Sequence, residues 1–153
     1  MTLAKGLGNG VPIGAFLCKD SCNVLEPGDH GSTFGGNPLA TAAANAAVRF
    51  MVTHEVPNDC LEIGLYFKSR LEAFRQSRPE LVSEIRGMGL LLALVFNDTI
   101  ARDVVSAANE QGLLLNPVRP DAIRFMPPLI ITESDVDEAM DKLESAVHIV
   151  VNT

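Results

Sequence analysis

The fold of this chain is decided by the stretch Leu90-Leu91-Leu92-Ala93-Leu94-Val95-Phe96. A continuous apolar run of this length predicts a strand that is buried on both faces. On its N-terminal side, periodicity alone leaves Leu81–Ile85 open between helix and strand. Its β-branched residues and the following Arg86-Gly87 favour a strand that ends in a turn. The two runs therefore predict a pair of neighbouring strands.

Helices are predicted on both sides of this pair. Pro57 opens one that runs to about Gln76. A second runs from about Ile100 to Gln111, where Gly112 is typical of the residue that follows a helix. Thr132 or Ser134 is expected to cap a third helix, whose apolar residues share one stripe.

Two short strands are predicted after the middle helix, which Thr99 or Asp98 is expected to cap. These strands are Leu113–Leu115 and Ala122–Phe125, around a turn at Asn116–Asp121. The resulting order of strands and helices predicts an α/β or α+β layer rather than a helix bundle.

The N-terminal third is rich in glycine and alanine. Ile13–Leu17 predicts a short strand, and His30–Gly36 predicts a loop because it has no periodic face. Asn37 is a good N-cap and Pro38 a good first residue for a helix over Leu39–Val52. This helix is so rich in alanine that it is expected to be buried against other elements.

Length and charge exclude several classes of function. The 153 residues are enough for one domain with a sizeable core. A net charge of −7 argues against a nucleic acid or an anionic membrane as a partner. No apolar run approaches the ~18 residues of a membrane span. Cys18, Cys22 and Cys60 have no metal-site pattern, so we expect reduced thiols, no bound metal and a cytoplasmic location.

Chemistry is expected near the start of the chain, in Thr2-Leu3-Ala4-Lys5-Gly6-Leu7-Gly8-Asn9-Gly10-Val11-Pro12-Ile13-Gly14. One lysine stands at the mouth of a loop with four glycines, where backbone can approach a bound group and an amine can be held against it. On spacing alone, a solvated terminal lysine is the alternative. The glycine spacing fits neither a Walker A loop nor a dinucleotide fingerprint.

Three motifs, in the same order, resemble the class III aminotransferases, which are pyridoxal-phosphate-dependent enzymes. The first is the lysine segment. The second is Gly28-Asp29-His30-Gly31-Ser32-Thr33-Phe34-Gly35-Gly36-Asn37-Pro38-Leu39-Ala40, and the third is Ile123-Arg124-Phe125-Met126-Pro127-Pro128-Leu129-Ile130. The resemblance spans nearly the whole chain, but only the C-terminal part of the family.

This resemblance implies an α/β fold, the C-terminal part of the aspartate-aminotransferase-like fold (fold type I). Residues 1–55 would be the incomplete end of the large domain that binds pyridoxal phosphate. Residues 56–153 would be the small C-terminal α/β domain. The composition also changes near residues 53–57, which favours a boundary there.

The resemblance implies roles for four side chains. Lys5 would bond to the cofactor aldehyde and then move a proton on the substrate carbon, which is amine chemistry. Thr33 would bind the cofactor phosphate in the partner subunit's site, and Ser32 would lie against the substrate. Arg124 would bind a carboxylate of the amino-acid or oxo-acid substrate.

Without the resemblance, these residues also have simpler structural explanations. A hydroxyl pair such as Ser32 and Thr33 often satisfies only its own backbone. Arg124 lies in an otherwise apolar strand and needs an anion there, which an ordinary salt bridge would also supply. Arg86 and Arg119 are expected to be structural or solvated.

The chain departs from the family before Lys5. The family places there an aspartate that holds the pyridine nitrogen, a phosphate-binding loop and an aromatic that stacks on the ring, whereas only four residues precede Lys5. Without that aspartate the ring is a poor electron sink. Met1 also falls where many relatives have an apolar residue inside a strand. We therefore expect a fragment from a truncated reading frame that is inactive alone.

Within the family, the chain resembles most the enzymes that act on N-acetylornithine. The expected reaction moves the terminal amino group of N-acetylornithine, or of a related ornithine derivative, to 2-oxoglutarate in arginine biosynthesis. The full-length family member is expected to be a cytoplasmic homodimer. Ornithine, succinylornithine and 4-aminobutyrate stay open as substrates, and a non-catalytic α/β remnant or interaction module is the alternative from another class.

Overall fold

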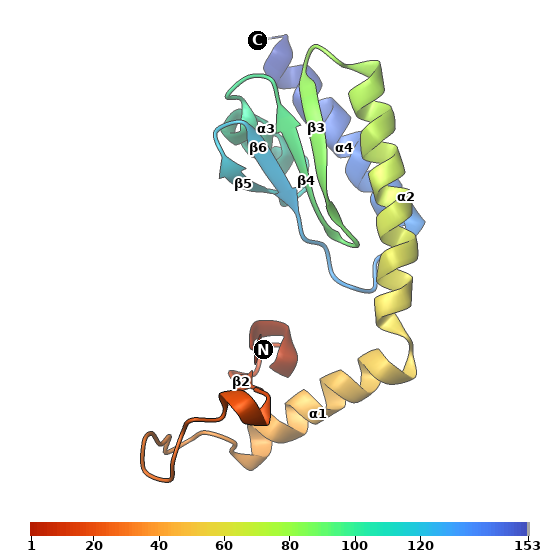
Figure 1. The fold of residues 1–153 in the computed structure, drawn as a ribbon. Coiled ribbons are helices and arrows are strands. Elements are labelled where there is room, and N and C mark those ends of the chain that lie inside the picture. Colours follow the sequence, from red (N-terminus) through yellow and green to blue (C-terminus); the bar gives the residue numbers. More distant parts are fainter. Residues whose placement is uncertain (153) are drawn as a thin grey trace. The chain divides into compact units, whose positions relative to one another are not determined.

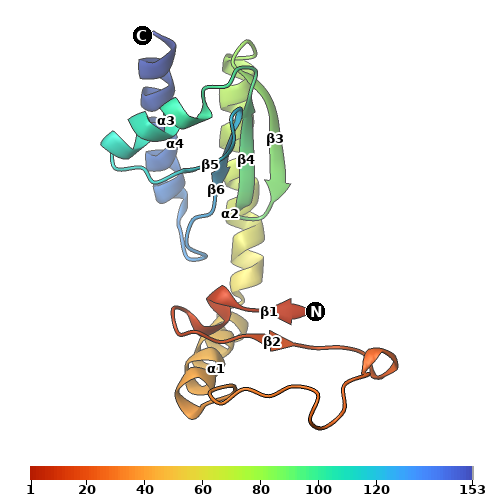
Figure 2. The ribbon, with the colours of Figure 1, turned by 90° about the vertical axis from the view of Figure 1, so that its left-hand side faces the viewer.

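The computed structural model describes residues 1–152 and contains two compact units, Met1–Val56 and the residues from Pro57 onward. Figures 1 and 2 show their helices and strands in two views. The main hydrophobic core lies wholly within the second unit. The two units therefore differ in how their elements are held.

The first unit is built mainly from turns and one helix. Strand β1 (Thr2–Leu3) pairs antiparallel with β2 (Ala15–Phe16), and α1 (Pro38–Thr53) ends the unit. Two short 3-10 helices, η1 (Lys5–Gly8) and η2 (Asp20–Cys22), follow β1 and β2. β2 is shorter than the predicted strand because β1 offers only two residues to pair with it.

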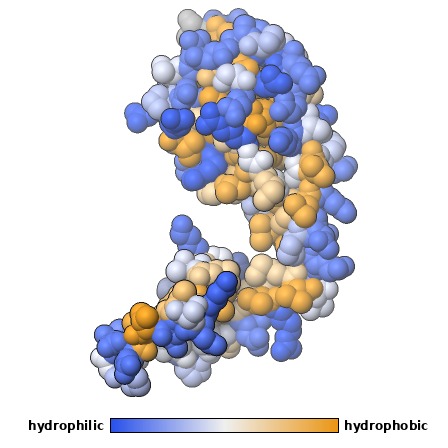
Figure 3. All heavy atoms as spheres, in the orientation of Figure 1, coloured by the Kyte–Doolittle hydropathy of each residue, from blue (hydrophilic) through white to orange (hydrophobic). Residues whose placement is uncertain are grey.

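Helix α1 begins as the sequence predicts. The Asn37 side chain accepts a hydrogen bond from the Ala40 backbone N–H at 3.0 Å, and Pro38 is the first helical residue. The prediction that this helix is buried is wrong for this structure, since only Ala40 and Ala44 of its residues are buried. The main contact of α1 is with η1, which is too short to cover it. Figure 3 shows apolar side chains gathered along α1.

The second unit is a layer of helices on a four-stranded antiparallel sheet. The sheet has the order β3-β4-β6-β5, with β3 at Val82–Met88, β4 at Leu91–Phe96, β6 at Ala122–Phe125 and β5 at Asn116–Arg119. The helices are α2 (Val56–Ser77), α3 (Ala101–Glu110) and α4 (Glu133–Val151). No helix within residues 1–152 combines the length and apolar character that crossing a bilayer requires.

The core lies between one face of this sheet and the three helices. Alternate residues of β4, namely Leu92, Leu94 and Phe96, are buried there. Phe67 of α2 packs edge-on against Phe125 of β6, with ring centroids 5.1 Å apart. The apolar stripe predicted for the last helix is also buried in this core; its residues are Val136, Met140, Leu143 and Val147. Leu91 is exposed, so β4 is not buried on both faces along its whole length.

The hairpin between β3 and β4 turns later than the sequence predicts. β3 continues through Arg86 and Gly87 to Met88, which pairs with Leu91, so the turn is Gly89-Leu90. Gly87 has φ +113, and a Cβ on it would lie 2.1 Å from the Leu91 carbonyl oxygen. This glycine is needed within the strand rather than at the turn.

Two further predictions are wrong in position. The strand expected at Leu113–Leu115 is β5, three residues later, because pairing with β6 fixes it there. The N-cap of α3 is Ile100, and no side chain caps this helix. The Ala101 backbone N–H instead donates to the Pro120 carbonyl at 3.0 Å, so a loop of the same unit satisfies the helix start.

Helix α2 touches the hairpin at a pair of glycines, and this contact can be tested. A Cβ on Gly64 would lie 2.5 Å from the backbone of Gly89. Gly64→Ala is expected to lower the free energy of unfolding by about 1–3 kcal/mol, as overpacking does, despite the better helix propensity of alanine. Thermal and denaturant unfolding measure this change. Glu62→Ala, on the exposed side of α2, is the control and should change little; an unchanged stability in Gly64→Ala would contradict the contact.

The start of α4 predicts a pH dependence. Thr132 and Asp135 form a capping box, in which the Thr132 backbone N–H donates to the Asp135 carboxylate at 2.7 Å. Hydrogen bonds from the Thr132 backbone and hydroxyl lower the pKa of Asp135 below its ordinary value of 3.8. As the pH falls, the Asp135 carboxylate therefore takes up a proton in the unfolded chain before it does so in the folded chain. The stabilisation that the cap gives to the folded state is accordingly lost as the pH falls below 3.8.

Asp135→Ala is accordingly expected to have a lower melting temperature than the wild type at neutral pH. The difference should shrink as the pH falls below 3.8 and through the lowered pKa of the folded-state carboxylate, because the wild-type cap is then protonated as well. Melting curves of both proteins across this range test the expectation. A difference that stays constant would show that the carboxylate does not carry the cap.

Candidate active site

Lys5 is the first residue of η1 and has an unusual backbone. Its φ is +54, in the left-handed region that residues with a Cβ rarely occupy. The turn is closed by backbone hydrogen bonds from Leu7 N–H to Ala4 and from Asn9 N–H to Gly6, each at 3.1 Å. The backbone of η1 thus fixes the direction in which the lysine side chain leaves the loop.

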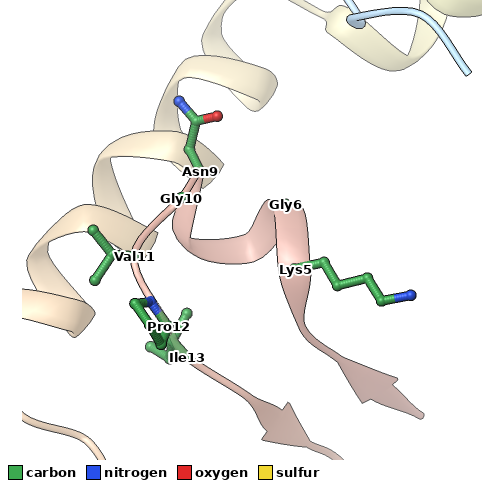
Figure 4. Close-up of a pocket in the computed structure, with 7 residues that line it drawn as sticks. All are labelled: Lys5, Gly6, Asn9, Gly10, Val11, Pro12 and Ile13. Atoms are coloured by element: carbon green, nitrogen blue, oxygen red, sulfur yellow. The ribbon is translucent and has the colours of Figure 1, made fainter.

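A hollow of about 460 Å³ lies beside this turn, and Figure 4 shows its residues. Its lining consists of Lys5, Gly6, Asn9, Gly10, Val11, Pro12 and Ile13. A Cβ on Gly6 or Gly10 would meet no atom within 4 Å, so the glycines leave open space along this wall. The Lys5 side chain is exposed and extends away from those of Asn9 and Val11. The arrangement offers an amine to a group bound at the edge of the hollow.

Ser32 and Thr33 lie in the exposed loop before α1. Gly35 folds back on this loop, and a Cβ on it would lie 2.8 Å from the Ser32 Cβ. At the end of the loop, the Asn37 side-chain amide donates to the Phe34 carbonyl at 2.9 Å. The residue that caps α1 therefore also holds the loop that carries the hydroxyl pair. Neither Ser32 nor Thr33 lines the hollow beside Lys5.

Arg124 belongs to β6 in the second unit. It pairs with Ala93 of β4 on one side and with Asn116 of β5 on the other. Its Nε is buried and has no hydrogen-bond partner among the described residues. Buried guanidinium nitrogens are normally hydrogen-bonded, so this atom is chemically incomplete. An acceptor from outside the described chain would complete it.

The candidate residues are therefore divided between the two units. Lys5, Ser32 and Thr33 lie in the first unit, and Arg124 lies in the second. Sequence reasoning missed Asn9, whose left-handed φ of +46 turns the chain at the end of η1. It also missed Asn116, which it placed in a turn. A left-handed Asn before Gly is a recognisable signal, whereas the pairing of Asn116 with Arg124 needs the sheet register.

Known proteins resemble this chain over nearly all of its length. The sequence profile of the class-III aminotransferases matches residues 1–147. Acetylornithine aminotransferase of Synechocystis sp. is 42% identical, covering 98% of this chain and 36% of its own length. Ornithine aminotransferase 2 of Staphylococcus saprophyticus is 43% identical, covering 94% of this chain and 36% of its own length.

The fold is shared as well. The crystal structure of acetylornithine aminotransferase from Elizabethkingia anophelis superposes with a TM-score of 0.86 at 36% identity. The superposed region covers 95% of this chain and 37% of the Elizabethkingia anophelis chain. The chain therefore has the mixed helix-and-sheet fold of part of a fold type I aminotransferase, as its sequence predicts, and spans little more than a third of the length of these relatives.

The packing of Gly35 against Ser32 can be tested directly. Gly35→Ala is expected to displace Ser32, since the added methyl would overlap its Cβ and its hydroxyl oxygen, 2.9 Å away. The backbone amide signals of Ser32 and Thr33 in an NMR spectrum should shift. Gly31→Ala is the matched control, because a Cβ there would meet no atom within 4 Å. Equal shifts in the two variants would show that Gly35 does not shape the loop.

Proposed function

Because the chain belongs to the class-III aminotransferase family, whose members are pyridoxal-phosphate-dependent enzymes, we propose that it supplies the lysine and a carboxylate-binding arginine of an aminotransferase. The proposed reaction moves the terminal amino group of N-acetylornithine to 2-oxoglutarate, as a step of arginine biosynthesis in the cytoplasm. The names of the relatives support this substrate class, with ornithine as the nearest alternative.

One observation carries the proposal. The lysine of the family's motif stands in a left-handed turn beside a glycine-lined hollow, within a segment similar to acetylornithine aminotransferases along nearly its whole length. Holding a lysine in this backbone region costs free energy, which is typical of functional positions. A solvated terminal lysine needs no such conformation.

The residues present fit the cofactor in chemical type. When bound, pyridoxal phosphate supplies an aldehyde that reacts with amines and a ring that withdraws electrons. Lys5 would hold it covalently through its amine and afterwards pass a proton to and from the substrate carbon. Thr33 would donate its hydroxyl to the phosphate in the partner subunit's site, in a homodimer, and Ser32 would lie against the substrate.

Arg124 would bind the substrate carboxylate. Its buried Nε lacks an acceptor among the described residues, and a guanidinium can bind a carboxylate through two parallel hydrogen bonds. We place residues 1–55 at the end of the large cofactor-binding domain and residues 56–153 in the small C-terminal domain. In this arrangement the covalent anchor and the carboxylate-binding residue belong to different domains.

The role of Lys5 can be tested on the full chain. The protein is mixed with pyridoxal phosphate, treated with borohydride to make the attachment permanent, and digested for mass spectrometry. We expect the label on Lys5 in preference to Lys19, Lys68 and Lys142, because Lys5 is the lysine that stands in the left-handed turn at the edge of the hollow. Lys5→Arg keeps the charge and should lose the selective label.

The same material tests whether the chain acts alone. It spans 36% of the Synechocystis relative, and we propose that it releases no glutamate from N-acetylornithine and 2-oxoglutarate by itself. Robust turnover would contradict this part of the proposal. Equal labelling of all four lysines would instead contradict the role of Lys5 and favour a non-catalytic α/β module, a candidate supported by the self-contained core of the second unit.

A further inference from the structure

A row of four residues crosses the sheet of the second unit through Arg124. Arg86 of β3 pairs with Ala93 of β4, Ala93 pairs with Arg124 of β6, and Arg124 pairs with Asn116 of β5. Residues that pair directly in antiparallel strands point to the same face, with Cβ atoms about 4.5–5.5 Å apart. All four side chains therefore lie on one face, opposite the buried Leu92 and Leu94.

The two arginines of this row are in different states. The Arg86 Nη2 lies 2.6 Å from the Glu84 carboxylate. The hydrogen bond from Arg86 lowers the pKa of Glu84 below its ordinary value. Arg86 therefore already has its anion. Arg124 keeps a buried Nε without an acceptor among residues 1–152. It is the cation of this row that a ligand would complete.

The two neighbours of Arg124 in this row are a small side chain on one side and a hydrogen-bond donor on the other. Ala93, which is half-buried, has the smallest side chain that a Cβ-bearing residue can have, so β4 places only a methyl group between the two arginines. Asn116 is exposed on β5, and its amide has two N–H donors. At cross-strand distance, this amide can reach an oxygen of a carboxylate that lies on the Arg124 guanidinium.

We infer that Asn116 is a second carboxylate-binding residue, which acts with Arg124 beside the small side chain of Ala93. The inference rests on the proposed role of Arg124 and adds a contact to it. Asn116 would donate one N–H to the carboxylate oxygen that faces β5, while the guanidinium holds the carboxylate from β6. Substrates with a carboxylate at the end that reaches this sheet are then selected over those with an alcohol or an amide there.

Binding can be measured without cofactor and without turnover. The full chain, labelled with ¹⁵N, is titrated with glutarate while the Nε–H signal of Arg124 is followed by NMR, and 1,5-pentanediol serves as the uncharged probe. The signal is assigned by its loss in Arg124→Gln. We expect glutarate, but not the diol, to shift it.

Asn116→Ala is expected to weaken glutarate binding about tenfold, the usual effect of losing one hydrogen bond to a charged group. Asn116→Asp is a sharper variant, because its carboxylate would pair with Arg124 and compete with the ligand. In this variant glutarate should no longer shift the Arg124 signal, while the melting temperature stays close to that of the wild type, a combination that a merely structural role would not produce. Ala93→Leu should also prevent binding by placing a larger side chain between the two arginines.

Asn109→Ala and Asn109→Asp, on the exposed side of α3, are the matched controls and should bind like the wild type. If glutarate shifts the Arg124 signal and Asn116→Ala binds equally well, the inference is overturned while the role of Arg124 stands. If glutarate leaves the wild-type signal unchanged, the proposed role of Arg124 fails, and the inference fails with it. Melting temperatures confirm that each variant is folded.

Discussion

Burial of one face of the antiparallel sheet is the constraint on which the second unit depends. Because side chains alternate along a strand, placing Leu92, Leu94 and Phe96 under the helices forces Ala93, and its partner Arg124, onto the opposite face. A register slip of one residue would turn the guanidinium into the apolar core and the leucines outward. The position of the carboxylate-binding candidate is therefore set by packing that it does not itself make.

The first unit relies on local backbone geometry instead. The η1 turn and the Asn37 cap are held by hydrogen bonds close in sequence, its only strand pair has two residues in each strand, and α1 buries only Ala40 and Ala44. Units with few buried contacts open more easily than packed sheets. The hollow beside Lys5 is thus carried by the less tightly packed unit, and the arginine by the firmly packed one.

Much of this architecture could be predicted from the sequence wherever the signal is local. Asn37-Pro38, Thr132 and Gly112 mark helix ends correctly because a cap depends on only a few neighbouring residues. The type I aminotransferase fold also followed from three motifs, and the comparisons confirm it.

Features that depend on distant contacts were placed wrongly or missed. The sequence predicts the turn at Arg86-Gly87, whereas the pairing of Met88 with Leu91 places it at Gly89-Leu90. β5 carries no apolar pattern because it is an exposed edge strand, so pairing with β6 alone locates it.

The left-handed backbone of Lys5 has a consequence for which substitutions are tolerated at this position during evolution. Glycine or asparagine at this position would relieve about 1 kcal/mol of strain. Where the amine has no function, replacing Lys5 by glycine or asparagine would therefore stabilise the fold. Lysine is then retained at this position only under continued selection for its chemistry.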